Sequence, residues 1–261
     1  KGILFMILSA LSFASMQVVV RMSREIPTME QICVRNLFIL IVSFFIIRKK
    51  HGSYYGPKKY QPYLFGRSFF GFLGLITLFY ASSHAVFMKE KLSQIQIPAL
   101  VLSVLGAFIV FRPSFQSDPF PLIVALLSAI TSGIAYTFLG YFKGKVDGIT
   151  VIMHFSTFSV FGSLPFVIGN FVMPDLRQFL LLMLISLFGS FGQVFITYAY
   201  RFAPASEISI YNYSGILFSI LLGAVVLGEP VKHTSILGGA LVAIASIMVY
   251  IYGNSKKKEA K

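Results

Sequence analysis

A few polar side chains of this chain lie inside long apolar runs, where they could take part in binding or proton transfer. Arg35 and His154 can carry positive charge, and Glu207, two residues into its segment, is the only acidic residue that lies within an apolar segment and not at its end or in a loop. A charged side chain at the centre of a bilayer costs about 2.5–3.5 kcal/mol on insertion scales unless it faces a cavity or a partner. These residues therefore indicate binding of a polar or anionic solute, with Glu207 and His154 as candidates for a proton relay.

Each of these side chains also has a purely structural interpretation. Arg35 would then extend to the membrane interface, or pair with Glu30 or Glu207 for stability. His154 would be a hydrogen-bonded imidazole of the core.

A polar patch follows Pro204 at residues 211–214. Adjacent residues cannot share one face of a helix, so an α-helix divides the patch into two stripes. Glu207, Tyr211 and Ser214 form the stripe that carries the carboxylate, and Ser209 and Asn212 form the other. The first stripe either lines a cavity or makes hydrogen bonds between helices.

The candidate substrate-binding residues are, in chain order, Gln17, Arg35, Tyr136, His154, Gln193, Glu207, Tyr211 and Ser214. Tyr80 and Tyr198 lie near the ends of apolar segments, where a tyrosine acts as a gate or as an interfacial anchor.

Nothing in the sequence indicates an enzyme. It contains no His-Glu-x-x-His, no Gly-x-Ser-x-Gly, no phosphate-binding glycine loop with lysine, and no paired carboxylates within one apolar segment. Cys33 is the only cysteine, which excludes a multi-thiolate metal site. We therefore expect no catalytic residue, no metal and no cofactor, and any uphill movement of solute would be driven by a gradient.

The composition is that of a membrane protein. Of the 261 residues, 56% are hydrophobic and 12% are charged, and the mean hydropathy is +0.80, whereas soluble domains carry about 25% charged residues. The 22 Lys and Arg against 9 acidic residues lie mostly in short links between apolar runs, which favours cytoplasmic loops over nucleic-acid binding. The expected partners are a small-molecule metabolite and the lipid bilayer, and a homodimer stays open.

Nine apolar segments are long enough to cross a bilayer, and no soluble domain fits between them. They are approximately Gly2–Val20, Met29–Ile47, Pro62–Ser82, Ile95–Phe111, Pro119–Tyr141, Thr150–Phe171, Gln178–Tyr200, Ala205–Leu227 and Ser235–Tyr252.

The chain repeats itself. The motif Gly-x-x-Gly-x5-Tyr-Ala at 71–81 returns at 189–199, a shift of 118 residues. The apolar run into Glu90 returns at Glu229, a shift of 139, so the second copy is longer by about one membrane span. At a shift of 119, Leu8–Ser12 aligns with Leu127–Thr131, and Arg35 with His154. The sequence thus predicts two repeats, with a fourth span absent between Ala85 and Val86.

The distribution of positive charge supports ten spans over nine. Outside the spans, nine spans place 9 Lys and Arg on the cytoplasmic side and 11 on the other, whereas a span inserted after Ala85 gives 15 against 5. Residues 85–92, fully extended, reach about 28 Å, less than the hydrocarbon core of about 30 Å. Either residues are missing after Ala85, or this is a deletion product with a shortened first repeat.

We therefore predict an all-α polytopic membrane protein with two inverted five-helix repeats, a ten-span plan of which nine spans are present. Two five-span copies must lie in opposite orientations, as in many secondary transporters. Residues 1–113 form the first repeat, 118–253 the second, and 254–261 a basic cytoplasmic tail.

These features resemble the drug/metabolite transporter superfamily and its EamA repeat. The resemblance rests on the apolar runs into Glu90 and Glu229, on Arg35 early in the second span, and on the 71–81 motif. Gly56-Pro57 before a third span containing Gly66-Arg67 is most similar to the eukaryotic solute carrier family thirty-five, G-like branch. The resemblance implies ten helices, cytoplasmic N- and C-termini, and transport of small metabolites. In this family the fourth span lines the central cavity.

The expected function is secondary transport, by exchange or facilitation, of a small polar or anionic metabolite through alternating access. The alternative is a membrane protein without transport activity, either a deletion isoform or a scaffold that packs against other membrane proteins.

Overall fold

The computed structural model describes residues 1–82, 120–203 and 208–231, together with short helical pieces between 233 and 248. Every regular element in these ranges is helical. The Ala85–Val86 junction, the predicted span at 95–111 and Glu207 lie outside the described residues.

The helices follow the predicted apolar segments closely. Their bounds are Gly2–Met22 for α1, Thr28–Lys50 for α2, Gln61–Ser82 for α3, Phe120–Tyr141 for α5, Gly148–Asn170 for α6, Leu176–Phe202 for α7 and Ser214–Leu227 for α9, with short 3-10 helices η1 at Lys58–Tyr60 and η2 at Ser209–Tyr213. Among the described residues, five helical stretches are long and apolar enough to cross a membrane. The chain is a multi-pass integral membrane protein.

Local signals explain where these helices begin and end. Asp175 caps α7 by accepting a hydrogen bond from the Gln178 backbone, while the Gln178 side chain accepts one from the Asp175 backbone. This reciprocal capping box satisfies two backbone donors that a helix start leaves free. Helix α2 ends at Lys50, where the next residue, His51, adopts the left-handed conformation and is followed by Gly52.

One predicted element differs from the structure. The sequence predicts a continuous α-helix over 205–227, but residues 209–213 form η2, between the α-helical Ile208 and helix α9, which begins at Ser214. Tyr211 and Ser214 are three residues apart and share a face in a 3-10 helix as well, and Ser214 Oγ donates to the Tyr211 backbone carbonyl at 2.7 Å. The third member of the expected stripe, Glu207, lies outside the described residues, so the stripe stays a prediction.

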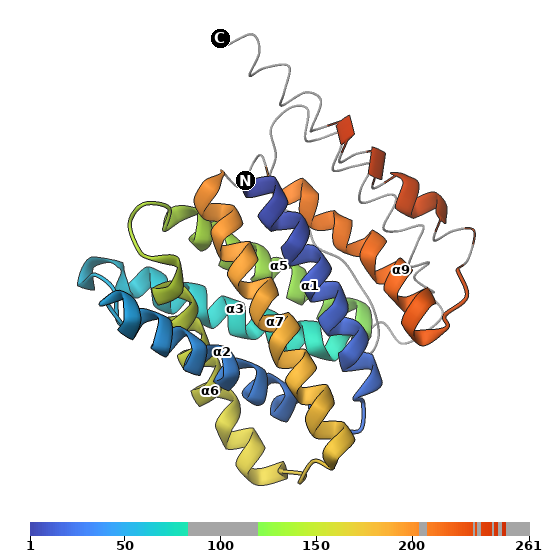
Figure 1. Cartoon of the computed structure of the whole chain (residues 1–261), viewed down its shortest axis with the longest axis horizontal. Coiled ribbons are helices and arrows are strands. Elements are labelled where there is room, and N and C mark those ends of the chain that lie inside the picture. The colour runs from blue at the N-terminus through green and yellow to red at the C-terminus, as the bar shows by residue number, and fades with distance from the viewer. Residues whose placement is uncertain are drawn as a thin grey trace.

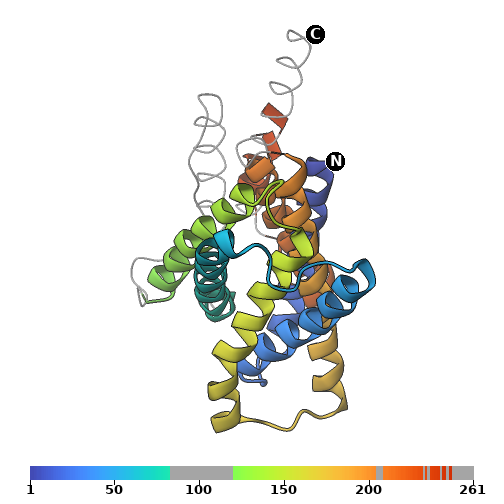
Figure 2. The same cartoon turned by 90° about the vertical axis from the view of Figure 1, so that its left-hand side faces the viewer.

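Two antiparallel helix pairs each contain an equivalent serine-to-carbonyl hydrogen bond. In α1·α7, Ser9 Oγ donates to the Gly192 carbonyl at 2.9 Å. In α3·α5, Ser128 Oγ donates to the Gly74 carbonyl at 3.0 Å. The serines and the glycines are equivalent positions of the sequence repeat, so the two pairs match in both sequence and contact. Figures 1 and 2 show the pairs side by side.

Helices α2 and α6 pack antiparallel between these pairs, α2 also against α7 and α6 also against α3 (Figure 1). Thr150 at the start of α6 donates to the Ser53 carbonyl beyond the end of α2. Glu30 at the start of α2 accepts the Val172 backbone N–H beyond the end of α6. The residues equivalent in the repeat, Arg35 on α2 and His154 on α6, thus lie on the two helices that cross the middle of the molecule.

The helix ends define two faces. On the first, which we call the basic face, the α2–α3 link at Ser53 contacts the start of α6, and Arg201 pairs with Asp147 at 2.8 Å. The described Lys and Arg at this face number nine: Lys1, Arg48, Lys49, Lys50, Lys58, Lys59, Lys143, Lys145 and Arg201. The opposite face has three: Arg21, Arg24 and Arg177.

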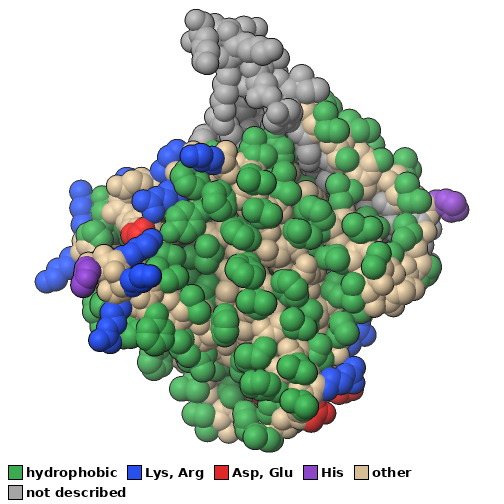
Figure 3. Space-filling view, in the orientation of Figure 1, with side chains coloured by type: hydrophobic (Ala, Val, Ile, Leu, Met, Phe, Trp, Pro, Cys, Tyr) green, Lys and Arg blue, Asp and Glu red, His purple; other side chains and the backbone are tan. Residues whose placement is uncertain are grey.

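Between these faces the outer surface is apolar, as Figure 3 shows for one side of the molecule. Large side chains such as Phe45, Phe161 and Ile168 are more than half exposed. A soluble protein rarely exposes so continuous an apolar surface. This band is the surface that lipid covers.

Candidate functional site

Arg35 is held in the centre of the helix bundle by α7. Its side chain is 3% exposed, and Nη2 donates to the Gly189 carbonyl at 3.4 Å, while Nε and Nη1 have no hydrogen-bond partner among the described residues. Glu30, an expected alternative partner, accepts the Val172 N–H instead, and the described ion pairs do not include Arg35. Arg35 is thus a buried cation with unused donors, as the binding interpretation requires.

A second buried arginine, Arg67, comes from α3. It is 2% exposed, and its guanidinium carbon lies 4.4 Å from the ring centroid of Phe155 on α6. This cation–π contact stabilises the charge, but Nε and Nη1 have no hydrogen-bond partner among the described residues. Arg35 and Arg67 lie within electrostatic reach of each other, so two like charges share one buried region.

Tyr136 on α5 completes this group, since it lies within electrostatic reach of both guanidinium groups. Its ring stacks against Tyr200 on α7, with centroids 5.9 Å apart. Gln193, one helical turn beyond Gly189 on α7, is buried, and its Nε2 has no hydrogen-bond partner among the described residues. We call Arg35, Arg67, Tyr136 and Gln193 the arginine site.

Two glycines make room for the guanidinium groups. A Cβ at Gly71 would overlap Arg67 Nη1, and a Cβ at Gly189 would overlap Arg35 Nε. The next glycines of the motif face neighbouring helices, because a Cβ at Gly74 would lie 2.6 Å from Ser132 Oγ, and one at Gly192 2.7 Å from Phe13. In each copy the first glycine therefore lies beside an arginine and close to a neighbouring helix, and the second lies against a neighbouring helix.

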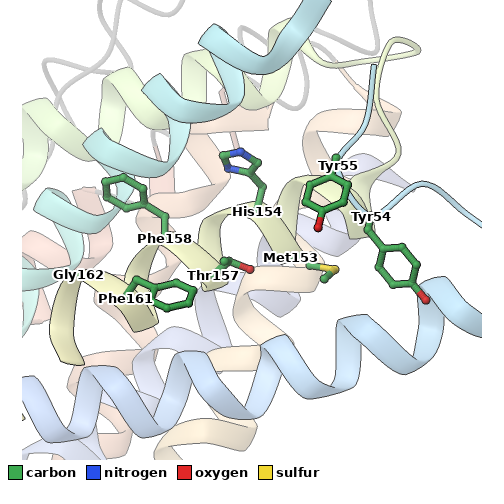
Figure 4. Close-up of a pocket in the computed structure, with 8 residues that line it drawn as sticks. All are labelled: Tyr54, Tyr55, Met153, His154, Thr157, Phe158, Phe161 and Gly162. Atoms are coloured by element: carbon green, nitrogen blue, oxygen red, sulfur yellow. The ribbon is translucent and has the colours of Figure 1, made fainter. Parts of the chain in front are cut away.

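His154 directly precedes Phe155, the residue whose ring contacts Arg67. Its ring is half-buried and Nδ1 is 3.0 Å from Ser68 Oγ on α3. It borders a cavity of about 480 Å³ whose other lining residues are Tyr54, Tyr55, Met153, Thr157, Phe158, Phe161 and Gly162 (Figure 4). This lining is mainly aromatic, so the cavity suits an apolar group. The hydrogen bond to Ser68 matches the core-imidazole interpretation of His154.

Of the remaining candidates, Tyr211 is buried in a core cluster that also contains Tyr200 and against which Tyr136 packs. Gln17 is partly exposed on α1. Tyr198 on α7 packs its ring near Phe5 and Phe202 at the basic face, which fits an anchor. Glu207 and the side chain of Tyr80 lie outside the described part of the chain.

The sequence-based site did not include Arg67. The residue type alone could have indicated Arg67 as a candidate, because placing a second arginine inside a membrane span costs as much free energy as placing Arg35 there. Its role was not visible from the sequence, because the contact that holds it is made by Phe155, 88 residues further along the chain.

Long apolar helices that surround buried cations with free donors define a membrane protein of the carrier type. The profile of the EamA-like transporter family matches residues 119–251, slightly more than half of the chain. The chain belongs to the EamA-like transporter family, which confirms the predicted resemblance.

Full-length relatives agree with this assignment. The pseudopaline exporter CntI of Pseudomonas aeruginosa is 25% identical over 271 residues, covering 95% of each chain. Human solute carrier family 35 member G1 is 24% identical over 293 residues, which cover 94% of this chain and 77% of that protein. A chain of known crystal structure superposes with a TM-score of 0.79 over 97% of this chain and 98% of its own length at 13% identity, which shows a shared fold.

Proposed function

We propose that the protein is a secondary transporter, an exchanger or facilitator, that moves a small polar or anionic metabolite by alternating access between two inverted repeats. The observation that carries this proposal is the buried Arg35, which reaches from a helix of the first half to the Gly189 carbonyl in the second. Its free donors are where a solute would bind, and the helices around it are the ones that would move.

The matched helix pairs support two inverted repeats. The sequence repeat aligns α1 with α5, α2 with α6 and α3 with α7. The contacts between helices follow the same correspondence: α1 packs against α7 as α5 packs against α3, and α2 packs against α7 as α6 packs against α3. Repeats related in this way rock against each other about a site at the membrane midplane.

The basic face supports ten spans with cytoplasmic termini. Nine spans would place the 51–57 link and the 143–148 link on opposite sides of the membrane. In the structure Thr150 contacts Ser53 across these links, so an even number of crossings separates them, which supports ten spans over nine. With nine described Lys and Arg against three at the opposite face, the basic face is the cytoplasmic one by the positive-inside rule.

One observation favours a second candidate, a membrane protein without transport activity. The alignment with the pseudopaline exporter runs over 271 residues, more than the 261 of this chain. The relative therefore has aligned positions for which this chain has no residue, as expected if a span is missing from the first repeat. A carrier without one cavity-lining helix would persist only as a shortened isoform or a scaffold.

Reconstitution distinguishes the two candidates. The purified chain, and a version with the aligned span of the exporter inserted between Ala85 and Val86, are placed in liposomes, and exchange of labelled organic anions and neutral solutes is measured. We expect exchange of an anion by at least the restored form. Arg35→Gln should abolish that exchange, and an exposed control, Lys49→Gln, should leave it unchanged. If neither form moves any solute, the protein without transport activity is the better description.

A further inference from the structure

The arginine site contains two positive charges and no described negative one. Arg35 and Arg67 are each at least 97% buried, and the two ion pairs of the described residues, Arg21 with Glu229 and Arg201 with Asp147, lie at the helix ends. Buried charges are normally paired, because desolvation is costly unless an opposite charge and hydrogen bonds compensate for it. Cation–π contact with Phe155 covers one face of Arg67, and its Nε and Nη1 have no hydrogen-bond partner among the described residues.

The two arginines approach the middle of the membrane from opposite faces. Arg35 is the eighth residue of α2, which starts at the face opposite the basic one, and Arg67 is the seventh residue of α3, which starts at the basic face. At 1.5 Å per residue each lies about 10 Å along its helix. Side chains from these two positions converge near the midplane, where carriers built from repeats bind their substrates.

The glycine motif places both guanidinium groups at equivalent positions of the fold. Arg35 fills the space beside Gly189, and Arg67 fills the space beside Gly71. Helix α7 with Gly189 and α3 with Gly71 are equivalent in the repeat. The two cations thus occupy matching places on the two sides of one site, although they come from non-equivalent positions in the sequence.

We propose that Arg35 and Arg67 together bind a small dianion, whose charged oxygens are shared between the two guanidinium groups, and that the dianion is the substrate class of the carrier. The proposal deepens the proposed transport function and rests on it. Guanidinium groups match the two-oxygen edge of a carboxylate or a phosphate, which they bind through paired N–H donors. A monoanion would leave one buried cation uncompensated, whereas a dianion neutralises both.

Binding is tested on the purified full chain in lipid nanodiscs, by thermal unfolding at matched ionic strength. Succinate and inorganic phosphate are the dianionic probes, lactate is the monoanionic probe and succinamide the neutral one. We expect a dianion to raise the melting temperature at a concentration at least ten-fold lower than lactate does, and succinamide to have no effect. Stabilisation by succinate alone assigns a dicarboxylate, and by phosphate alone a phosphate ester.

The variants assign the response to the two arginines. Arg35→Gln and Arg67→Gln should each remove the dianion response, and the exposed control Arg48→Gln should retain it. If the Gln variants do not fold, Arg35→Lys and Arg67→Lys keep the charge but lose the paired donors, and should weaken the response about ten-fold. The proposal is overturned if lactate binds as tightly as succinate, if no dianion stabilises the folded chain, or if folded variants respond as the wild type does.

The experiments can disprove the transport function and the dianion site independently of each other. If the protein exchanges a neutral solute in liposomes and Arg67→Gln leaves that exchange unchanged, the transport function stands and the dianion site is wrong. If the chain binds a dianion through both arginines but exchanges no solute, the site stands and transport by this form of the chain is wrong.

Discussion

Gly71 and Gly189 occupy the same place in the two copies of one motif, and each borders an arginine side chain. From the sequence, both glycines of each copy are expected to permit close helix approach, and the first ones do so too: an added Cβ would lie 3.0 Å from Phe155 of α6 at Gly71 and 3.0 Å from Met16 of α1 at Gly189. The first glycine of each copy also leaves a space without a Cβ where a guanidinium fits. A residue type that usually indicates helix packing here determines where a charge can lie.

We expect Gly71→Ala and Gly189→Ala to displace the guanidinium groups. Each group ends a flexible side chain, so it can move, and the loss of unfolding free energy should be about 1 kcal/mol, at the low end for overpacking. Dianion binding, which depends on the position of the donors, should weaken about ten-fold. Thermal unfolding with and without succinate measures both effects.

Gly140→Ala is the matched control, since no atom lies within 4 Å of the added Cβ and alanine is the better helix former. It should not lower the melting temperature and should leave succinate binding intact. Equal binding by Gly140→Ala and Gly189→Ala would contradict the role assigned to the motif.

At the scale of elements, a cross-half ion pair lies at the face opposite the basic one. Arg21 in the last turn of α1 contacts Glu229, which follows α9, at 2.8 Å. The ion pair at the basic face, Arg201 with Asp147, joins two helices of the second half. Alternating access requires the halves to separate at one face at a time, so the Arg21–Glu229 pair opposes opening at its face.

We expect Glu229→Gln to make Cys33 more reactive. Cys33 is buried on α2 and is the only cysteine of the chain. Residues two apart do not share a helix face, so alkylation of Cys33 by a maleimide reports loosening of the packing around α2 rather than access to Arg35 itself. An exposed ion pair contributes at most about 1 kcal/mol, so labelling should rise about two- to five-fold. Asp147→Asn breaks the pair at the other face and should leave the rate unchanged, whereas equal rates in all three proteins would remove Arg21–Glu229 as a closing contact.

The helices themselves were predictable. From α1 to α7 the described bounds fall within three residues of the predicted segments, because Pro, Gly and charge interrupt uniformly apolar runs. Which helices pack against each other could not be predicted from the sequence, because lipid-facing and buried positions are both apolar in this chain. The 3-10 helix at 209–213 was not predicted for a related reason. A polar patch of a few residues is too short for its periodicity to distinguish a 3-10 helix from an α-helix.

At the scale of the whole molecule, orientation is the open property with the simplest test. His51→Cys lies in the α2–α3 link, and Met173→Cys lies in the α6–α7 link, where Met173 is 80% exposed. In a Cys33→Ser background, a membrane-impermeant maleimide added to intact cells should label Met173→Cys and not His51→Cys. Permeabilised cells, in which both should react, provide the control, and the reverse pattern would place the basic face outside.

The arginine site also has an electrical consequence. Both cations belong to helices of the first half, α2 and α3, while their repeat counterparts, His154 and Ile185, contribute no fixed charge. In the proposed mechanism, the described part of the empty site would reorient with two positive charges, and a bound dianion would neutralise both. We expect membrane potential to act on the return of the empty form and not on one-for-one exchange, so the cell's voltage would set how readily the protein performs net transport.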